Sequence, residues 1–189
     1  MGILKTALQK AVRKQIDKHF KYSAKGKSTT ARDISREIRE IRKKQKLADD
    51  IKKHAQMQSI GLLKIVNDCA ELVNTTTSPE VFFMRYNLML ENLEKLVGLE
   101  CTGIFENSKE LPSEAFSRIE AQFDAATNDF LQRSFEKAKA HADTLKTDSG
   151  KTNAIKRYFD NMEKYIIHMN GKSLEYFDKM KETFLKGTN

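Results

Sequence analysis

The chain has 189 residues, enough for one domain with an extension but too few for two ordinary domains and a linker. Hydrophobic residues make up 39% and charged residues 32%, while glycine (8) and proline (2) are scarce, which argues against a turn-rich β-sandwich or barrel. No segment approaches the roughly 20 consecutive apolar residues that a spanning helix needs. We therefore expect a soluble, largely helical, basic protein.

The first residues and the cysteines bear on the compartment. The opening MGILKTALQKAV has no continuous apolar stretch of the kind found in secretory signals. Cys69 and Cys101 form no C-x-x-C pair, and Cys69 falls in an apolar helical segment, where we expect it to be a small buried side chain. These features predict a cytoplasmic protein with reduced thiols. The opening also fits a myristoylation pattern at Gly2, but that pattern fixes only two positions.

Charge and aromatic residues are distributed unevenly along the chain. Residues 1–53 hold 17 of the 34 Lys and Arg but only 6 of the 26 Asp and Glu, a local balance of +11. No aromatic residue occurs between Tyr22 and Phe82. We therefore expect a basic helical arm over residues 1–54 and a helical bundle domain, which holds the core, over residues 55–189.

The arm is predicted to contain two helices. Apolar residues recur at helical spacing over residues 1–20, whereas residues 21–29 show no periodicity and predict a flexible joint. Thr30 is suited to cap a second helix that continues to about Val73. The first half of this helix is thinly apolar, and its second half is rich enough in apolar residues to be buried.

The clearest predicted boundary lies at residues 74–77, Asn-Thr-Thr-Thr. Ser78 is a good N-cap and Pro79 fits the first position of a helix that runs to about Val97. After a loop over residues 98–112, Ser113 is predicted to cap a long helix that reaches Leu145. Its aromatic residues recur every seven positions, at Phe116, Phe123 and Phe130.

Two more helices complete the prediction. Residues 147–153 are predicted to form a loop, with Asn153 as the cap of a helix over residues 154–169. Asn170-Gly171 is typical of a helix end, and a short last helix follows. The predicted fold is all-α: an antiparallel helical bundle of about four core helices over residues 55–186, with a basic N-terminal helical arm.

No pattern of catalytic residues is recognisable. Gly150-Lys151-Thr152 resembles the end of a P-loop, but the earlier glycine and the preceding strand are both missing. The four histidines are far apart, and none belongs to a metal-binding motif. Glu91 and Glu94 lie on the polar face of an amphipathic helix. We therefore expect a protein that is not an enzyme and has no cofactor, and we identify no small-molecule substrate.

The most suggestive surface is the basic part of the arm. A helix here can contact a protein partner or a second copy through a thin apolar stripe, or an anionic surface through its basic side chains. The acidic residues between the basic ones, and the absence of aromatic residues for base stacking, favour the first interpretation. We predict a non-enzymatic interaction or adaptor protein; the alternative is binding of nucleic acid or an anionic membrane. The candidate residues are Arg36, Arg39, Arg42, Lys43, Lys44, Lys46, Ile34, Ile38 and Ile41.

Two segments resemble a known domain. Asn74, Thr75, Thr76, Pro79, Phe82, Phe83, Arg85 and Tyr86 match its first pattern, N-T-T-x-x-P-x-x-F-F-x-R-Y. Leu145, Lys146, Thr147, Gly150, Lys151, Asn153, Ile155, Tyr158 and Phe159 match its second. Over about residues 60–170 the chain is similar to an uncharacterised helical domain that recurs in Firmicutes and their phages. The resemblance implies a helical module of unknown function from a bacterial or phage source, and it carries over no catalytic residue. Within the first pattern, Arg85 is suited to donate to carbonyl groups at a neighbouring helix end.

Overall fold

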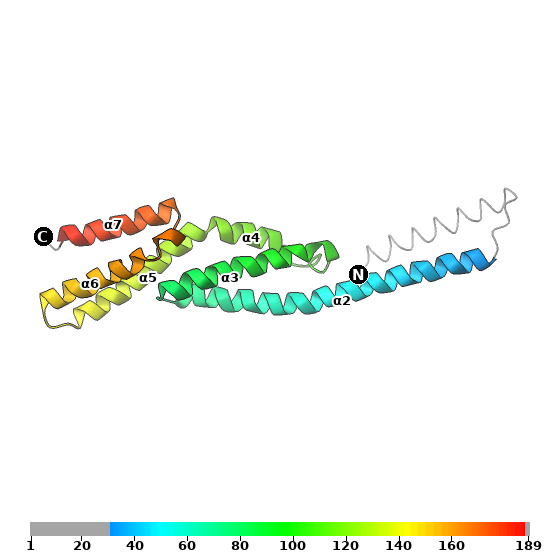
Figure 1. Ribbon diagram of the computed structural model, residues 1–189, viewed down its shortest axis with the longest axis horizontal. Coiled ribbons are helices and arrows are strands. Elements are labelled where there is room, and N and C mark those ends of the chain that lie inside the picture. Colours follow the sequence, from blue (N-terminus) through cyan, green and yellow to red (C-terminus); the bar gives the residue numbers. More distant parts are fainter. Residues whose placement is uncertain (1–30, 188–189) are drawn as a thin grey trace. The chain divides into compact units, whose positions relative to one another are not determined.

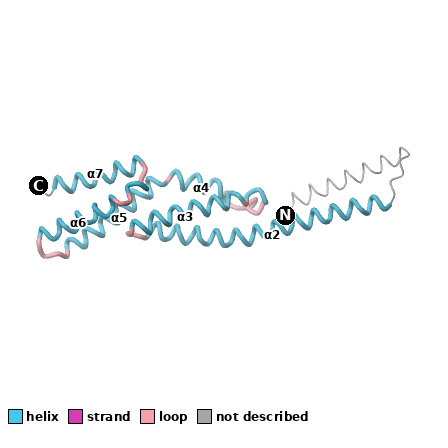
Figure 2. The backbone as a smooth tube through the Cα atoms, viewed as in Figure 1, coloured by secondary structure: helices cyan, strands magenta, loops and turns pink. Residues whose placement is uncertain are grey.

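The structure is a computed structural model that describes residues 31–187. In this range every regular element is helical, which confirms the all-α prediction (Figures 1 and 2). The predicted helix over residues 1–20, the joint after it and the cap at Thr30 lie outside the described residues. The elements are α2 (Ala31–Thr75), α3 (Pro79–Gly98), η1 (Glu100–Thr102), α4 (Pro112–Ala121), α5 (Phe123–Asp143), α6 (Asp148–Glu163), η2 (Ile166–His168) and α7 (Gly171–Gly187).

Contacts between residues divide the chain into two compact units, residues 1–51 and residues 52–189. In the first unit the structure describes the beginning of α2. In the second it describes the rest of α2 and the helices α3 to α7. Within residues 31–187, no helix has a stretch that is both long and apolar enough to cross a bilayer.

The connection between α2 and α3 lies where the sequence predicts it. Helix α2 ends at Thr75 and α3 begins at Pro79, with Ser78 in the N-cap position. The Ser78 side chain makes no capping hydrogen bond; its backbone N–H instead donates to Thr76 Oγ1 at 3.1 Å. Because the connection is short, α3 returns antiparallel to the end of α2 (Figure 1).

The core of the second unit is built around the aromatic residues at the start of α3. The Phe82 ring stacks on Phe130 of α5, with centroids 4.4 Å apart, and Tyr86 meets Phe123 edge to face at 4.9 Å. Cys69 of α2 is 1% exposed, as expected for a small buried side chain. Helix α3 also packs on α4, and α5 packs on both α6 and α7. The aromatic cluster therefore joins α3 to α5.

The prediction of one long helix from Ser113 to Leu145 is wrong. The structure has two helices here, α4 and α5, which are separated at Gln122. The first begins at Pro112, one residue before the predicted cap. Ser113 does not cap it, because its backbone N–H donates to Glu100 Oε1 at 2.6 Å and its hydroxyl donates to Glu100 Oε2 at 3.2 Å. A contact between Ser113 and the distant Glu100 thus replaces the predicted capping hydrogen bond within the helix.

The predicted limits of the last two helices also need correction. Residues 147–153 are not a loop: Thr147 caps α6, which begins at Asp148, and Asn153 lies inside the helix. Helix α6 ends at Glu163 rather than at residue 169, and η2 follows it. Gly171 begins α7 instead of ending a helix. The Asn170 N–H donates to Ser173 Oγ at 3.0 Å at this start.

Candidate functional site

The six basic candidate residues of the arm all lie on α2 and are exposed. Within the range that the structure describes, none of them forms an ion pair with a carboxylate. Helical spacing of about 100° per residue places four of them, Arg36, Arg39, Lys43 and Lys46, opposite Ile34. Arg42 and Lys44 lie on the two flanks, and we call all six the basic face.

The three isoleucines of the arm lie on one side of α2, and we call them the apolar seam. Ile34 and Ile38 are each 39% exposed, and Ile41 is half-buried. Alternate steps of four and three residues along the helix lead from Ile34 to Val73, the spacing of a coiled-coil heptad. In the second unit this register is occupied mainly by buried residues, Ala55, Ser59, Val66, Cys69 and Val73. The seam therefore has the register of a packing face.

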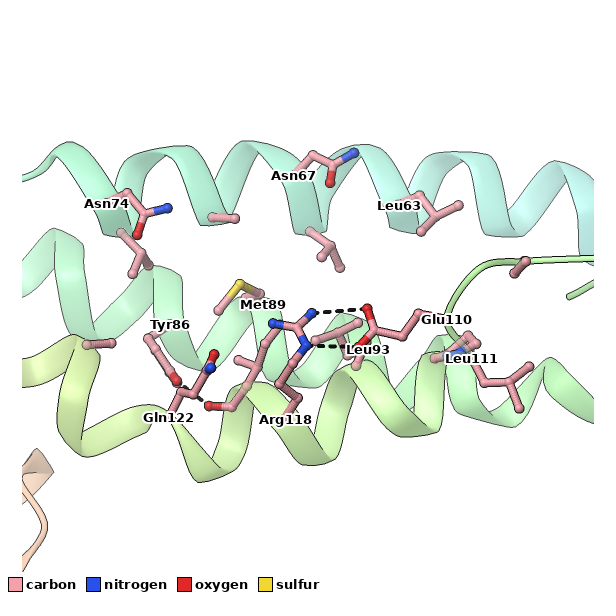
Figure 3. Close-up of a pocket in the computed structure, with 18 of the residues that line it drawn as sticks. Leu63, Asn67, Asn74, Tyr86, Met89, Leu93, Glu110, Leu111, Arg118 and Gln122 are labelled. Atoms are coloured by element: carbon pink, nitrogen blue, oxygen red, sulfur yellow. Dashed lines mark hydrogen bonds and ion pairs between the residues drawn. The ribbon is translucent and has the colours of Figure 1, made fainter.

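A groove between α2, α3 and α4 is a feature that the sequence did not predict (Figure 3). Its volume is about 480 Å³, within the range of ligand and peptide sites. Met89 and Leu93 of α3 form its floor. Val66 of α2 and Ile119 of α4 are among the apolar residues of its walls. Small side chains leave the space open: Ala70, Ala115 and Ala126.

One ion pair lines the groove and joins the loop before α4 to the last turn of that helix. Arg118 Nε donates to Glu110 Oε1 at 2.8 Å, and Arg118 Nη2 donates to Glu110 Oε2 at 3.1 Å (Figure 3). This paired hydrogen bond lowers the pKa of the Glu110 carboxyl. Both side chains are about half exposed, so the pair orients the loop before α4 and contributes little stability.

Tyr86 anchors the inner end of the groove. Its hydroxyl donates to the Ile119 carbonyl at 2.5 Å, close to the interruption between α4 and α5 at Gln122. Burial raises the pKa of Tyr86 to about 12, so the phenol stays protonated at neutral pH. It is therefore a hydrogen-bond donor, and it cannot act as a base.

An arginine satisfies the end of α2, but it is not the one that the sequence suggested. Arg85 was expected to donate to carbonyl groups at a neighbouring helix end. The structure leaves its Nε buried without a hydrogen-bond partner. Arg133 of α5 takes that role, because its Nη2 donates to the Val73 carbonyl at 3.0 Å. The positions of Arg85 and Arg133 in the sequence do not show which of them reaches the end of α2.

Clusters of metal-ligating side chains and groups with shifted pKa values are the features that bear on metal binding and catalysis. Among residues 31–187, no group of three or more His, Cys, Asp or Glu side chains lies close enough together to hold a metal ion. Besides Glu110 and its partner Arg118, the described groups with a shifted pKa are Tyr86 and Tyr158. Burial raises the pKa of Tyr158 to about 12 as well. The groove itself is lined mainly by apolar side chains.

No protein-family model, curated protein or solved structure matches the chain.

Proposed function

We propose that the chain is a non-enzymatic interaction or adaptor protein of the bacterial or phage cytoplasm. In this proposal residues 55–186 form an antiparallel bundle of about four core helices that serves as a scaffold. The basic arm, residues 1–54, contacts a protein partner or a second copy of the chain. The pairing of α3 with α4 and of α5 with α6 supports the scaffold role.

The observation that carries the proposal is the division of α2 into unlike faces between residues 33 and 51. The apolar seam lies on one side, and the basic face lies opposite it. Exposed apolar residues at heptad spacing are typical of helices that pair, because pairing removes these side chains from water. The charges opposite the seam keep such a helix hydrated on its outer side.

The groove beside α3 supports an interaction protein over an enzyme. Its floor and walls are mainly apolar. The polar side chains around it are amides, the hydroxyl groups of Ser108 and Tyr86, and the Arg118–Glu110 pair. Enzymes that transfer protons or acyl groups need an acid, base or nucleophile with a matched pKa. The pKa of Tyr86 is raised far above neutrality, so this phenol does not meet that need.

The alternative function is binding of nucleic acid or an anionic membrane through the basic face. The six exposed basic side chains without ion pairs favour it, since all of them are available to phosphate groups. Contacts to phosphates release counterions, so such binding weakens steeply as salt rises. This dependence separates the two functions.

Sedimentation velocity of matched variants of the full chain tests the proposal. We expect the wild type to self-associate and the triple variant Ile34→Ser, Ile38→Ser, Ile41→Ser to remain monomeric, because serine removes the apolar contact. The matched control neutralises four residues of the basic face with Arg36→Gln, Arg39→Gln, Arg42→Gln and Lys43→Gln, and it should associate like the wild type. Loss of association only in the charge variant would contradict the proposal.

A further inference from the structure

A second pocket is lined by residues of α5, α6 and α7. These three helices form the C-terminal part of the second unit (Figure 1). Its volume is about 760 Å³. Its apolar lining comes from all three helices, with Phe135 and Ala142 from α5, Ile155 from α6, and Met180 and Phe184 from α7. Such a lining suits a long flexible hydrocarbon chain.

Each of the three helices also contributes one lysine to this pocket. Lys139 comes from α5, Lys151 from α6 and Lys179 from α7. In the part of the chain that the structure describes, none of these ammonium groups has a hydrogen-bond or ion-pair partner. Three like charges around one apolar pocket favour an anion that neutralises them together.

The two carboxylates of the pocket do not remove this preference. Glu136 and Asp143 are exposed, and Glu136 accepts a hydrogen bond from Gln132 Nε2 at 3.1 Å. Helical spacing on α5 places Lys139 between these acids and the apolar pair Phe135 and Ala142. The lysine is therefore nearer to the apolar lining than either acid is.

Lys151 supplies an independent observation. It is half-buried, and it lies near the amino end of α6, which begins at Asp148. A cation is unfavourable there because the amino end of a helix carries a partial positive charge. A bound anion would offset this effect.

We propose that this pocket binds an anionic amphiphile with a single long apolar chain. The hydrocarbon lies against Phe135, Ile155 and Met180, and the acidic headgroup lies among the three lysines. A free long-chain carboxylate and an anionic membrane lipid share this chemistry. The site is separate from the arm on which the adaptor function rests.

Calorimetric titration of the full chain with monomeric oleate tests the proposal. We expect oleate to bind and octanoate, which buries less hydrocarbon, to bind at least about tenfold more weakly. The variant Lys139→Gln, Lys151→Gln, Lys179→Gln should also weaken oleate binding about tenfold. The matched control, Lys156→Gln, Lys164→Gln, Lys172→Gln, removes the same charge from exposed lysines that do not line the pocket, and it should bind normally.

A second variant tests the pocket itself. Thr183 is exposed and lines the pocket, so Thr183→Trp should obstruct it and abolish oleate binding while the melting temperature of the free protein stays the same. Absence of oleate binding, or equal weakening in both lysine variants, would overturn the proposal. Tight binding of an acidic peptide, when it is titrated in place of oleate, would also overturn the proposal.

Competition with vesicles distinguishes the two sources of the ligand. Displacement of oleate by phosphatidylglycerol vesicles, but not by phosphatidylcholine vesicles, would support the site and identify a membrane lipid as its source. Persistence of oleate binding in the presence of both vesicles would support the site with a free carboxylate. Equal displacement by both vesicles would overturn the role of the lysines.

Discussion

Tyr86 and Tyr158 each fix a neighbouring helix through a buried phenol. Tyr86 donates to the Ile119 carbonyl at 2.5 Å, and Tyr158 donates to the Leu131 carbonyl at 3.1 Å and lies 2.9 Å from the Ser134 hydroxyl. Burial is the main cause that raises the pKa of each tyrosine to about 12. The phenols are therefore sensitive to alkaline conditions.

The two tyrosines predict a loss of stability at alkaline pH. In the unfolded chain a tyrosine ionises near its ordinary pKa of about 10, whereas in the folded protein Tyr86 and Tyr158 ionise near 12. Their contribution is therefore fully present below pH 10 and is lost as the pH rises through 12. Urea unfolding at pH 9 and pH 11 measures this loss.

The double variant Tyr86→Phe, Tyr158→Phe is the control, because phenylalanine cannot ionise. Its free energy of unfolding should fall less between pH 9 and pH 11 than that of the wild type. At pH 9 it should already be less stable than the wild type, because the hydrogen bonds of both phenols are missing. An equally steep loss in the double variant would show that other groups cause the alkaline unfolding.

The burial of a single residue could be predicted from the sequence where the neighbouring residues of the same helix determine it. Cys69 is buried as expected, because it lies in an apolar helical segment whose pattern identifies the packing face. The role given to Arg85 was wrong, because Arg133, far along the chain, approaches the end of α2. The pattern of residues along one helix does not show which side chain from a distant part of the sequence will contact the end of that helix.

At the scale of the elements, the start of α6 depends on one threonine and one glycine. Thr147 Oγ1 accepts a hydrogen bond from the Gly150 N–H at 3.1 Å. A Cβ atom at Gly150 would lie only 2.8 Å from this oxygen, so glycine permits the close approach that the cap needs. The pair fixes the first turn of the helix.

Removal of this cap should destabilise the protein measurably. We expect Thr147→Ala to lower the free energy of unfolding by about 1 kcal/mol, because the Gly150 N–H loses its acceptor. The matched control is Ser149→Ala in the same turn, where the side chain is exposed, and it should change stability by less than about 0.5 kcal/mol. Equal effects of the two substitutions in urea unfolding would contradict the capping role.

The helical type of the elements was more predictable than the number of helices and their ends. Thr147 and Asn153 are both suitable N-caps, and the sequence alone does not choose between them. The seven-residue recurrence of Phe116, Phe123 and Phe130 predicts an uninterrupted helix. The structure interrupts it at Gln122, near the Ile119 carbonyl to which Tyr86 donates. Such contacts form only after distant segments have packed.

At the scale of the whole molecule, the sequence shows how charge is distributed along the chain, but it does not show which surfaces form after folding. The balance of +11 over residues 1–53 is visible from counting alone. The groove between α2, α3 and α4 was missed, because it depends on where Ala70, Ala115 and Ala126 leave space after folding. The pocket between α5, α6 and α7 was missed for the same reason: its lysines come from three helices.

The central claim is that the arm associates through its apolar seam and not through its charge. Apolar contacts depend weakly on salt, whereas contacts to phosphates weaken by about a thousandfold or more between low and moderate salt. The direct measurement is sedimentation equilibrium of the full chain at 0.05 M and 0.5 M sodium chloride. We predict self-association at both salt concentrations, with an association constant that changes by less than about threefold. A monomer at both concentrations, or association that disappears at the higher salt concentration, would contradict the claim.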